Sequence, residues 1–113
     1  MNEYIVFDTE YTAWPDSQKN NWSEPNEYKE IVQIGGLKIS DGEVIEQLNI
    51  YIKQKKNPTL SNYFTRLTGI TQEKVDKYGL DFELAMKNLY AFTIGIENVY
   101  SWGNDWHVIK ENM

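Results

Sequence analysis

Residues 4–10 read YIVFDTE, a short apolar run that ends in two acidic residues separated by one position. The run has the length and the β-forming side chains of a strand, and its continuous apolar character favours a strand buried on both faces at the centre of a sheet. Asp8 and Glu10 are expected at the end of this strand. Because side chains two apart in a strand project from the same face, the two carboxylates are expected to converge.

The pattern around this strand predicts more sheet structure after a long interruption. Residues 11–28 hold two of the three prolines, several Asn and Ser, and no hydrophobic period, which predicts a long loop. From Ile31 onward, apolar residues lead into Asp41-Gly42, a favoured two-residue hairpin turn. Apolar and polar residues then alternate over 47–52, which predicts a half-buried third strand.

The second half of the chain is predicted to be mainly helical. Gly69 is expected to stop a short first helix, and Thr71 to cap a second one that ends near Gly79. A longer helix is expected from Asp81, with its apolar period reaching Ile96. The full prediction is helices over 60–67, 71–79, 81–96 and 105–113, and a fourth strand over 99–102. Strands first and helices later, with one returning strand, predict an α/β or α+β sheet in one domain, 1–113.

The composition fits one small globular domain and excludes several classes of protein. A hydrophobic fraction of 41% in 113 residues is enough for a core. The sequence shows no apolar run of membrane-spanning length and no signal-peptide pattern, so we expect no membrane partner. Cysteine is absent, which excludes disulfides and thiolate metal sites and favours a cytoplasmic protein.

The charge balance leaves two kinds of partner open. A net charge of −6 gives no sign of the basic face that usually neutralises nucleic-acid phosphates. It is compatible with carboxylates that hold divalent cations, which in turn meet phosphates. It is equally compatible with a protein that binds other proteins.

Three acidic residues are candidates for metal binding. Asp8 and Glu10 would repel each other and lose hydration at the end of a buried strand unless a cation joined them, and hard oxygen ligands suit Mg²⁺ or Mn²⁺. The alternative is that Asp8 ends the strand in a turn and Glu10 is solvated. Asp105 follows an apolar strand at the start of a helix, where it either caps that helix or points into the same crevice.

Four segments in this order resemble the DEDDh family of 3′→5′ exonucleases. Residues 4–10 resemble its first motif, and residues 30–36, EIVQIGG, resemble the strand after its variable loop. Residues 64–71, FTRLTGIT, resemble its Leu-Thr-Gly-Ile-Thr segment. Residues 101–105, SWGND, resemble its second motif, in a form similar to the branch that trims RNA 3′ ends. The resemblance covers nearly the whole chain.

The resemblance implies a ribonuclease H-like mixed sheet flanked by helices and a two-metal hydrolysis. In that scheme Asp8, Glu10 and Asp105 would hold two Mg²⁺ or Mn²⁺ ions, which clamp the attacking water and the leaving oxygen. The substrate would be the 3′ end of single-stranded RNA or DNA.

The resemblance also implies substrate contacts. Leu67 and Thr68 would lie near the terminal nucleotide. The backbone from Thr9 to Tyr11 would lie near its sugar.

The family's third motif supplies a general-base histidine and a fourth metal-binding aspartate, well beyond the second motif. This chain ends at Met113, before such a helix. We therefore expect the N-terminal part of an exonuclease domain, C-terminally incomplete, as a fragment or an inactive truncation. His107 is the single histidine, and it is predicted to be a surface residue because positions i and i+2 of a helix diverge.

Two sets of residues have a binding and a structural interpretation. Trp14 and Trp22 could stack on a terminal base or could pack the loop onto its own domain. Lys53, Lys55 and Lys56 could contact phosphates or could be solvated at an exposed turn.

The whole chain also has an alternative interpretation. It is a non-catalytic, acidic binding or regulatory protein, an inhibitor or a partner of a nucleic-acid enzyme. A truncated sheet would leave a surface uncovered, which predicts self-association or a protein partner there.

Overall fold

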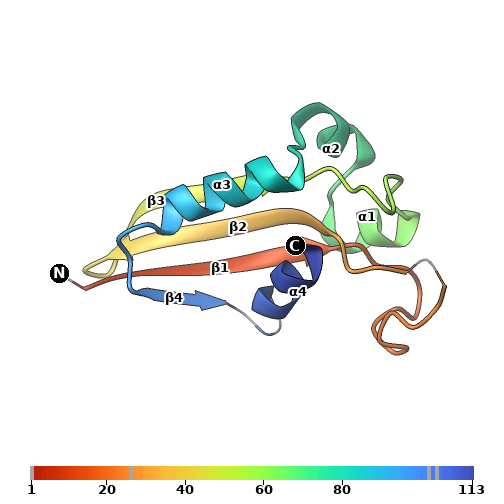
Figure 1. The fold of residues 1–113 in the computed structure, drawn as a ribbon, viewed down its shortest axis with the longest axis horizontal. Coiled ribbons are helices and arrows are strands. Elements are labelled where there is room, and N and C mark those ends of the chain that lie inside the picture. The colour runs from red at the N-terminus through yellow and green to blue at the C-terminus, as the bar shows by residue number, and fades with distance from the viewer. Residues whose placement is uncertain (1, 26, 102, 104) are drawn as a thin grey trace.

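A mixed sheet forms the centre of the fold in the computed structural model, which describes residues 2–25, 27–101, 103 and 105–113. The strand order is β3-β2-β1-β4, with β1–β2 and β2–β3 antiparallel and β1–β4 parallel (Figure 1). The strands are β1 (Glu3–Tyr11), β2 (Ile31–Ser40), β3 (Glu43–Tyr51) and β4 (Asn98–Ser101). This arrangement confirms the predicted mixed sheet with the first strand in its interior.

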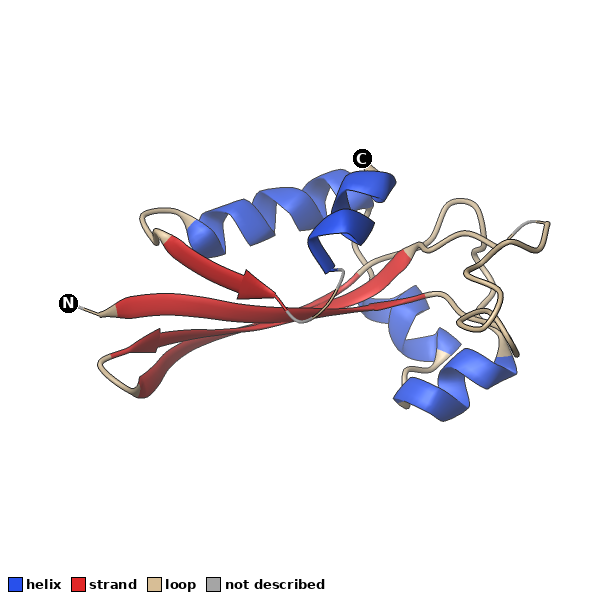
Figure 2. Ribbon diagram, turned by 90° about the horizontal axis from the view of Figure 1, so that it is seen from below, coloured by secondary structure: helices blue, strands red, loops and turns tan. Residues whose placement is uncertain are grey.

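Strand β1 differs from the prediction in length and in burial. It continues to Tyr11, which lies opposite Ile31 after an irregularity in the pairing, so the two acids lie within the strand and not after it. The prediction of burial on both faces is wrong: Ile5 and Phe7 are buried on one face, whereas Asp8 on the other face is exposed. The reason is that helices cover this part of the sheet on one side only (Figure 2).

The hairpin between β2 and β3 has the predicted turn. Asp41 and Gly42 both have positive φ angles, 50° and 85°. Such a turn matches the twist of the two strands that it joins. The alternation over 47–52 is also confirmed, since Ile50 and Ile52 are buried and Asn49 is exposed.

The helices begin at the residues whose side chains cap them. Ser61, Thr71 and Asp81 each accept a hydrogen bond from a backbone N–H of the first turn, which satisfies a donor that the helix leaves unpaired. The first helix therefore starts after residue 60, later than predicted. The helices are α1 (Asn62–Thr68), α2 (Gln72–Tyr78), α3 (Phe82–Thr93) and α4 (Asp105–Asn112).

The end of α3 corrects another prediction. The helix ends at Thr93, so Ile96 lies outside it. The C-cap Ile94 has an extended backbone, and Gly95 follows with a left-handed φ of 82°, so the chain turns away from the helix there. Strand β4 then begins at Asn98, one residue earlier than predicted, and Trp102 lies outside the described residues.

Two hydrophobic clusters lie on opposite sides of the sheet. Helices α3 and α4 pack on one side through residues such as Leu89 and Val108, against Phe7 of β1. Helices α1 and α2 lie on the other side, at the end of the sheet from which the long loop extends, and pack Phe64 against Val32 of β2 (Figure 2). The rest of that second side has no helix on it among the described elements.

The predicted loop is confirmed and is packed onto the domain. The described residues between Tyr11 and Ile31 contain no helix or strand. Thr12 donates its backbone N–H to the Glu30 carbonyl at 2.9 Å, and the Trp22 indole N–H donates to the Thr12 carbonyl at 2.8 Å. The first bond joins the two ends of the loop beside the end of β1, and the second ties the middle of the loop to its start.

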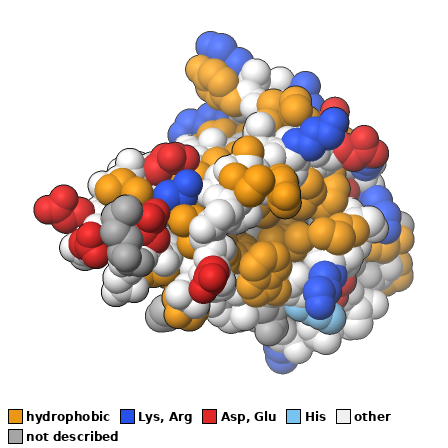
Figure 3. Space-filling view, turned by 60° about the vertical axis from the view of Figure 1, so that its left-hand side comes forward, with side chains coloured by type: hydrophobic (Ala, Val, Ile, Leu, Met, Phe, Trp, Pro, Cys, Tyr) orange, Lys and Arg blue, Asp and Glu red, His pale blue; other side chains and the backbone are white. Residues whose placement is uncertain are grey.

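The surface of the described chain carries several large apolar side chains. Val44 and Ile45 on β3 are 51% and 55% exposed, and Tyr100 on β4 is 55% exposed. Hydrophobic side chains also gather at the centre of the face that Figure 3 presents. No helix among the described residues is long and apolar enough to cross a membrane.

Candidate active site

Strand β1 delivers acidic and hydroxyl side chains to two faces of the sheet near its end. Thr9 is buried on the face of Phe7, whereas Asp8 and Glu10 project from the opposite face, as the two-residue period requires. Glu10 is half-buried and lies just before the irregularity in the pairing with β2.

Asp105 reaches this strand from the start of α4. Its side chain is only 4% exposed, and its Oδ1 accepts a hydrogen bond from the Thr9 hydroxyl at 2.5 Å. The ring of Trp106 packs edge-on against Phe7, with ring centroids 5.0 Å apart, which fixes the first turn of α4 on β1. The Thr9 bond accounts for the orientation of Asp105.

One cavity of about 490 Å³ joins the three predicted metal ligands. Asp8, Glu10 and Asp105 all line it, although the third lies nearly the whole chain away from the first two. Thr9, Tyr11 and Leu67, which were predicted to contact substrate, line it as well. The remaining lining residues that the structure describes are Ala13, Trp14, Gln18, Asn21, Trp22, Lys29, Tyr63 and Gly103.

Two acids of this cavity, Glu10 and Asp105, have raised pKa values. Burial raises the pKa of Glu10 above its ordinary value of 4.5, and the charges of Asp8 and Asp105 raise it further. Burial also raises the pKa of Asp105, as does its proximity to Asp8, while the hydrogen bond from Thr9 lowers it. Burial raises the pKa of the Tyr11 phenol most, and the charges of Asp105 and Glu10 raise it further. Mutual repulsion of this kind is relieved by a cation.

The residues fit a divalent cation in their chemistry. Asp105 keeps one buried oxygen, Oδ2, that has no hydrogen-bond partner among the described residues, and a buried carboxylate oxygen in that condition favours a cation as its neighbour. The donor set is all carboxylate oxygen, which suits Mg²⁺ or Mn²⁺. Among the residues that the structure describes, however, no three Asp, Glu, His or Cys side chains lie close enough together to hold a metal ion. Joint coordination would therefore require the side chains to approach one another.

Residues of the long loop form one wall of the cavity. The rings of Tyr11 and Trp22 lie 5.4 Å apart, and the Lys29 ammonium lies 4.8 Å from the centre of the Trp22 ring. Trp22 therefore packs the loop onto β1, the structural one of its two interpretations. Trp14 also lines the cavity, where it is half-buried.

Some predicted residues lie elsewhere. Thr68 does not line the cavity: its hydroxyl donates to the Phe64 carbonyl and accepts from the Ile70 N–H. His107 is a surface residue, as predicted, with its side chain 70% exposed and 2.9 Å from the Glu111 carboxylate.

The lysine turn also lies away from the acids. The Glu30 carboxylate accepts the backbone N–H groups of Lys55, Lys56 and Asn57 at 3.0, 2.9 and 2.6 Å. The Lys56 ammonium lies over the Tyr28 ring, 4.3 Å from its centre. This turn is therefore held by Glu30, and the lysine that lines the cavity is Lys29.

Lys29 and Tyr63 are the lining residues that the sequence pattern gave least reason to choose. Lys29 lies immediately before an ordinary strand pattern, and Tyr63 lies in a short helix of mixed composition. Only the packing of the loop and of α1 around the end of β1 brings them to the acids.

Comparison with known proteins places the chain in a family. The RNase_T family model, described as Exonuclease, matches residues 5–93, which is more than half of the chain. The chain therefore belongs to this exonuclease family. The matched range contains Asp8 and Glu10 and ends before Asp105.

Individual relatives agree with this assignment. The chain is 33% identical over 113 residues to the probable 3′-5′ exonuclease KapD of Bacillus subtilis (strain 168), a match that covers 98% of this chain and 53% of KapD. It is 35% identical over 72 residues to ERI1 exoribonuclease 2 of Xenopus laevis, covering 64% of this chain and 10% of that protein. The chain thus spans about half the length of KapD and a small part of the Xenopus protein.

The fold has solved counterparts. The nuclease domain of 3′hExo, a DEDDh family member bound to rAMP, matches with a TM-score of 0.76 and 19% identity. The match covers 96% of this chain and 58% of that one. The expected ribonuclease H-like fold of the DEDDh nucleases is thereby confirmed.

Proposed function

We propose that this chain carries the metal-binding half of a 3′→5′ exonuclease site that acts on the 3′ end of single-stranded RNA or DNA. The observation that supports this most directly is the meeting of Asp8, Glu10 and Asp105 in one cavity that also has aromatic walls. A cavity of about 490 Å³ falls within the usual range of small-ligand sites. Membership of the exonuclease family supports a role of these acids in phosphodiester hydrolysis.

The three carboxylates would hold two divalent ions, Mg²⁺ or Mn²⁺. Bound ions supply the positive charge that stabilises the attacking and leaving oxygens of a phosphodiester during in-line displacement. Thr9 keeps Asp105 oriented through its 2.5 Å hydrogen bond, so that Oδ2, which the described residues leave without a partner, is available.

The other walls of the cavity would position the substrate. Leu67 is 64% exposed on α1 and lines the cavity together with Tyr63, so an apolar surface faces the acids and can contact a terminal base. Lys29 brings a positive charge from the loop to the same cavity, where it can meet a phosphate. These contacts would place the terminal phosphodiester at the acids.

Water activation would need a proton acceptor besides the three metal-binding acids, and the chain's histidine does not line the cavity. His107 is exposed, pairs with Glu111 and does not line the cavity. We propose that residues 1–113 are the N-terminal part of the exonuclease domain and that the base and a fourth acid come from a further segment. The 53% coverage of KapD and the 58% coverage of the 3′hExo domain support this proposal.

Substrate and location are proposed at the level that the relatives support. The 3′hExo structure contains rAMP, and the Xenopus relative is called an exoribonuclease, so RNA is the first substrate to test and DNA the second. The cytoplasmic location stays a prediction. The comparisons give no support to the alternative of a non-catalytic binding protein.

The test is a nuclease assay with a matched acidic control. A 5′-labelled single-stranded RNA and the DNA of the same sequence are incubated with Mg²⁺ or Mn²⁺ and the protein, alone and extended by the C-terminal half of KapD. We expect a ladder of shortened products from the extended protein, its loss in Asp8→Ala, and no loss in Glu83→Ala, an exposed acid on α3 outside the cavity. Equal activity of both variants, or no ladder from the extended wild type, would contradict the proposal.

A further inference from the structure

Strand β3 lies at one edge of the sheet and carries exposed apolar side chains. It is nine residues long and, among the strands that the structure describes, pairs with β2 alone, so one side of its backbone lacks a described neighbouring strand along most of its length. Its sequence, EVIEQLNIY, contains no proline or lysine, the residues that commonly protect an edge from further pairing. Val44 and Ile45 are more than half exposed.

The hydrogen bonds at the end of β3 show which backbone groups point outward. Ile52 donates its N–H inward to the Val32 carbonyl of β2 at 2.8 Å. The Tyr51 carbonyl points the other way, because it accepts from the Leu80 N–H at 2.8 Å. Since these directions alternate along a strand, the N–H and carbonyl groups of Asn49 and Gln47 also point outward.

One residue of the chain already uses this edge. Leu80 forms an isolated parallel bridge with Ile52, and its carbonyl accepts the Lys53 N–H at 2.8 Å. The chain then turns into α3 and leaves the edge. In the described part of the chain, no strand continues the pairing beside Asn49 and Gln47.

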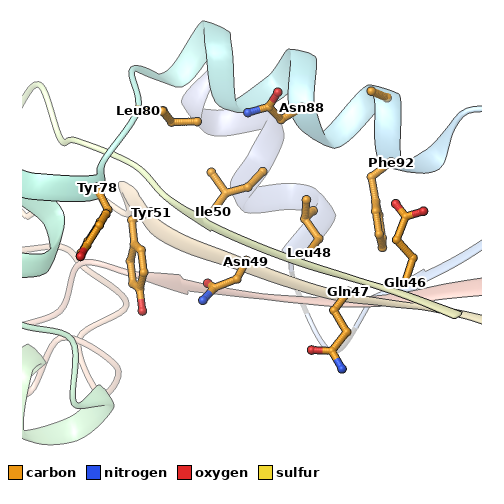
Figure 4. A pocket seen from close by; sticks show the side chains of 11 residues that line it. Glu46, Gln47, Leu48, Asn49, Ile50, Tyr51, Tyr78, Leu80, Asn88 and Phe92 are labelled. Atoms are coloured by element: carbon orange, nitrogen blue, oxygen red, sulfur yellow. The ribbon is translucent and has the colours of Figure 1, made fainter. Parts of the chain in front are cut away.

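A groove runs beside the open part of the edge. It has a volume of about 710 Å³ and lies between β3 and α3. In Figure 4, Leu48 and Ile50 point from β3 toward α3, whereas Gln47 and Asn49 point away from the helix. Phe92 completes the apolar lining from α3.

The charge at the groove identifies the kind of occupant. Glu46 lines the groove with a side chain 54% exposed, and its contact with Lys38 is 3.7 Å long. Glu43 lies on the same strand, which has no basic residue. Antiparallel pairing with a second copy of β3 would bring acidic strands together, and like charges across a strand pair are destabilising. A strand with a basic residue complements this edge better.

We propose that β3 and α3 form a docking site for an extended peptide that adds to the sheet as a further strand. The peptide places apolar side chains beside Leu48 and Ile50 and a basic side chain beside Glu46. Its backbone pairs with the outward groups of Gln47 and Asn49. This is the mode of recognition in which main-chain hydrogen bonds supply affinity and alternate side chains supply selectivity. It uses no residue of the acidic cavity.

The probe is a fluorescent form of the peptide acetyl-Thr-Val-Thr-Leu-Thr-Lys-Thr-amide, with binding followed by anisotropy. In the antiparallel register its Val, Leu and Lys lie opposite Ile50, Leu48 and Glu46, and its two central Thr residues lie opposite Asn49 and Gln47. N-methylation of those two Thr nitrogens blocks the backbone bonds and should weaken binding at least about tenfold. N-methylation of the Leu and Lys nitrogens, which point to solvent, should not.

Variants of the protein test the same bonds from the other side. Asn49→Pro removes an outward N–H that makes no bond to β2, a position at which an edge strand tolerates proline. It should abolish binding, whereas Asn49→Thr, which keeps the N–H, should retain it. Glu46→Lys should weaken binding of this peptide and favour a version with Glu in place of Lys.

Three results would overturn the proposal. The first is no binding at about 1 mM peptide, the weak end of measured affinities. The second is equal binding of the two N-methylated peptides to the wild-type protein, which remains decisive if Asn49→Pro does not fold. The third is a dimer at equilibrium sedimentation that Asn49→Pro dissociates, because the occupant of the edge would then be a second copy.

Discussion

Replacing Thr9 by valine removes the hydroxyl that donates to Asp105 while nearly keeping the shape of the side chain. Both residues are almost fully buried, with 5% and 4% exposure, and Asp105 Oδ2 has no hydrogen-bond partner in the described part of the chain. The variant therefore removes the side-chain donor that holds this buried carboxylate among the described residues. A hydrogen bond to a charged group contributes about 1.5–3 kcal/mol, and we expect that loss in the free energy of unfolding. Each kcal/mol lowers the Tm of a domain of this size by roughly 4–8 °C.

The assay is urea denaturation near neutral pH without divalent ions, on Thr9→Val and on the control Thr9→Ser. The serine variant keeps the hydroxyl and loses one methyl group, which costs about 0.8 kcal/mol. In an Asp105→Asn background the valine change should cost less, because the hydroxyl then bonds to a neutral amide. The reasoning is refuted if Thr9→Val and Thr9→Ser lose equal stability, or if the cost of valine is unchanged beside Asn.

Three further changes test the packing and the electrostatics. Glu10 has a raised pKa, so its contribution to stability is full below its ordinary value of 4.5 and is lost as pH rises through the raised pKa. In urea denaturation without divalent ions, the free energy of unfolding of Glu10→Gln should therefore rise relative to that of the wild type between about pH 4 and about pH 7, and a constant difference would contradict this. Phe64→Ala should lower the free energy of unfolding by about 3–5 kcal/mol in the same measurement, because the side chain is 1% exposed. The control Leu67→Ala on the same helix removes a side chain that is 64% exposed and should change the free energy of unfolding by less than about 0.5 kcal/mol. Gly79→Ala should lower the Tm because the added carbon would lie 2.4 Å from a backbone oxygen. In Gly35→Ala the added carbon meets nothing within 4 Å, so the Tm should not fall, and similar shifts in the two variants would count against the packing described.

The sequence predicted most elements of the fold from local signals, although the start of α1 at Ser61 and the end of α3 before Gly95 were missed. Gly69 and the capping residues Thr71 and Asp81 mark helix boundaries by their own chemistry, and the helices begin and end there. The length of β1 was missed because its last residues are polar and become strand through pairing with β2, a contact far away in sequence. The one-sided burial was missed for a similar reason, since coverage of a sheet depends on where helices dock.

The candidate site divides in the same way. Asp8 and Glu10 follow from their spacing in one strand, and Asp105 followed from its place between an apolar strand and a helix and from the resemblance of its segment to an exonuclease motif. The bond from Thr9 to Asp105 joins two residues 96 positions apart, and no local pattern indicates it. The place of Lys29 in the cavity depends on the path of the loop, which has no period to interpret.

Titration of the metal-free protein with Mn²⁺ in a calorimeter measures the event on which the proposed function rests. We predict saturable binding by the wild type, strong weakening in Asp8→Asn and in Asp105→Asn, and unchanged binding in Glu83→Gln. Absence of binding by the wild type, or the same affinity in all four proteins, would mean that the acids gathered around the end of β1 do not form a cation site.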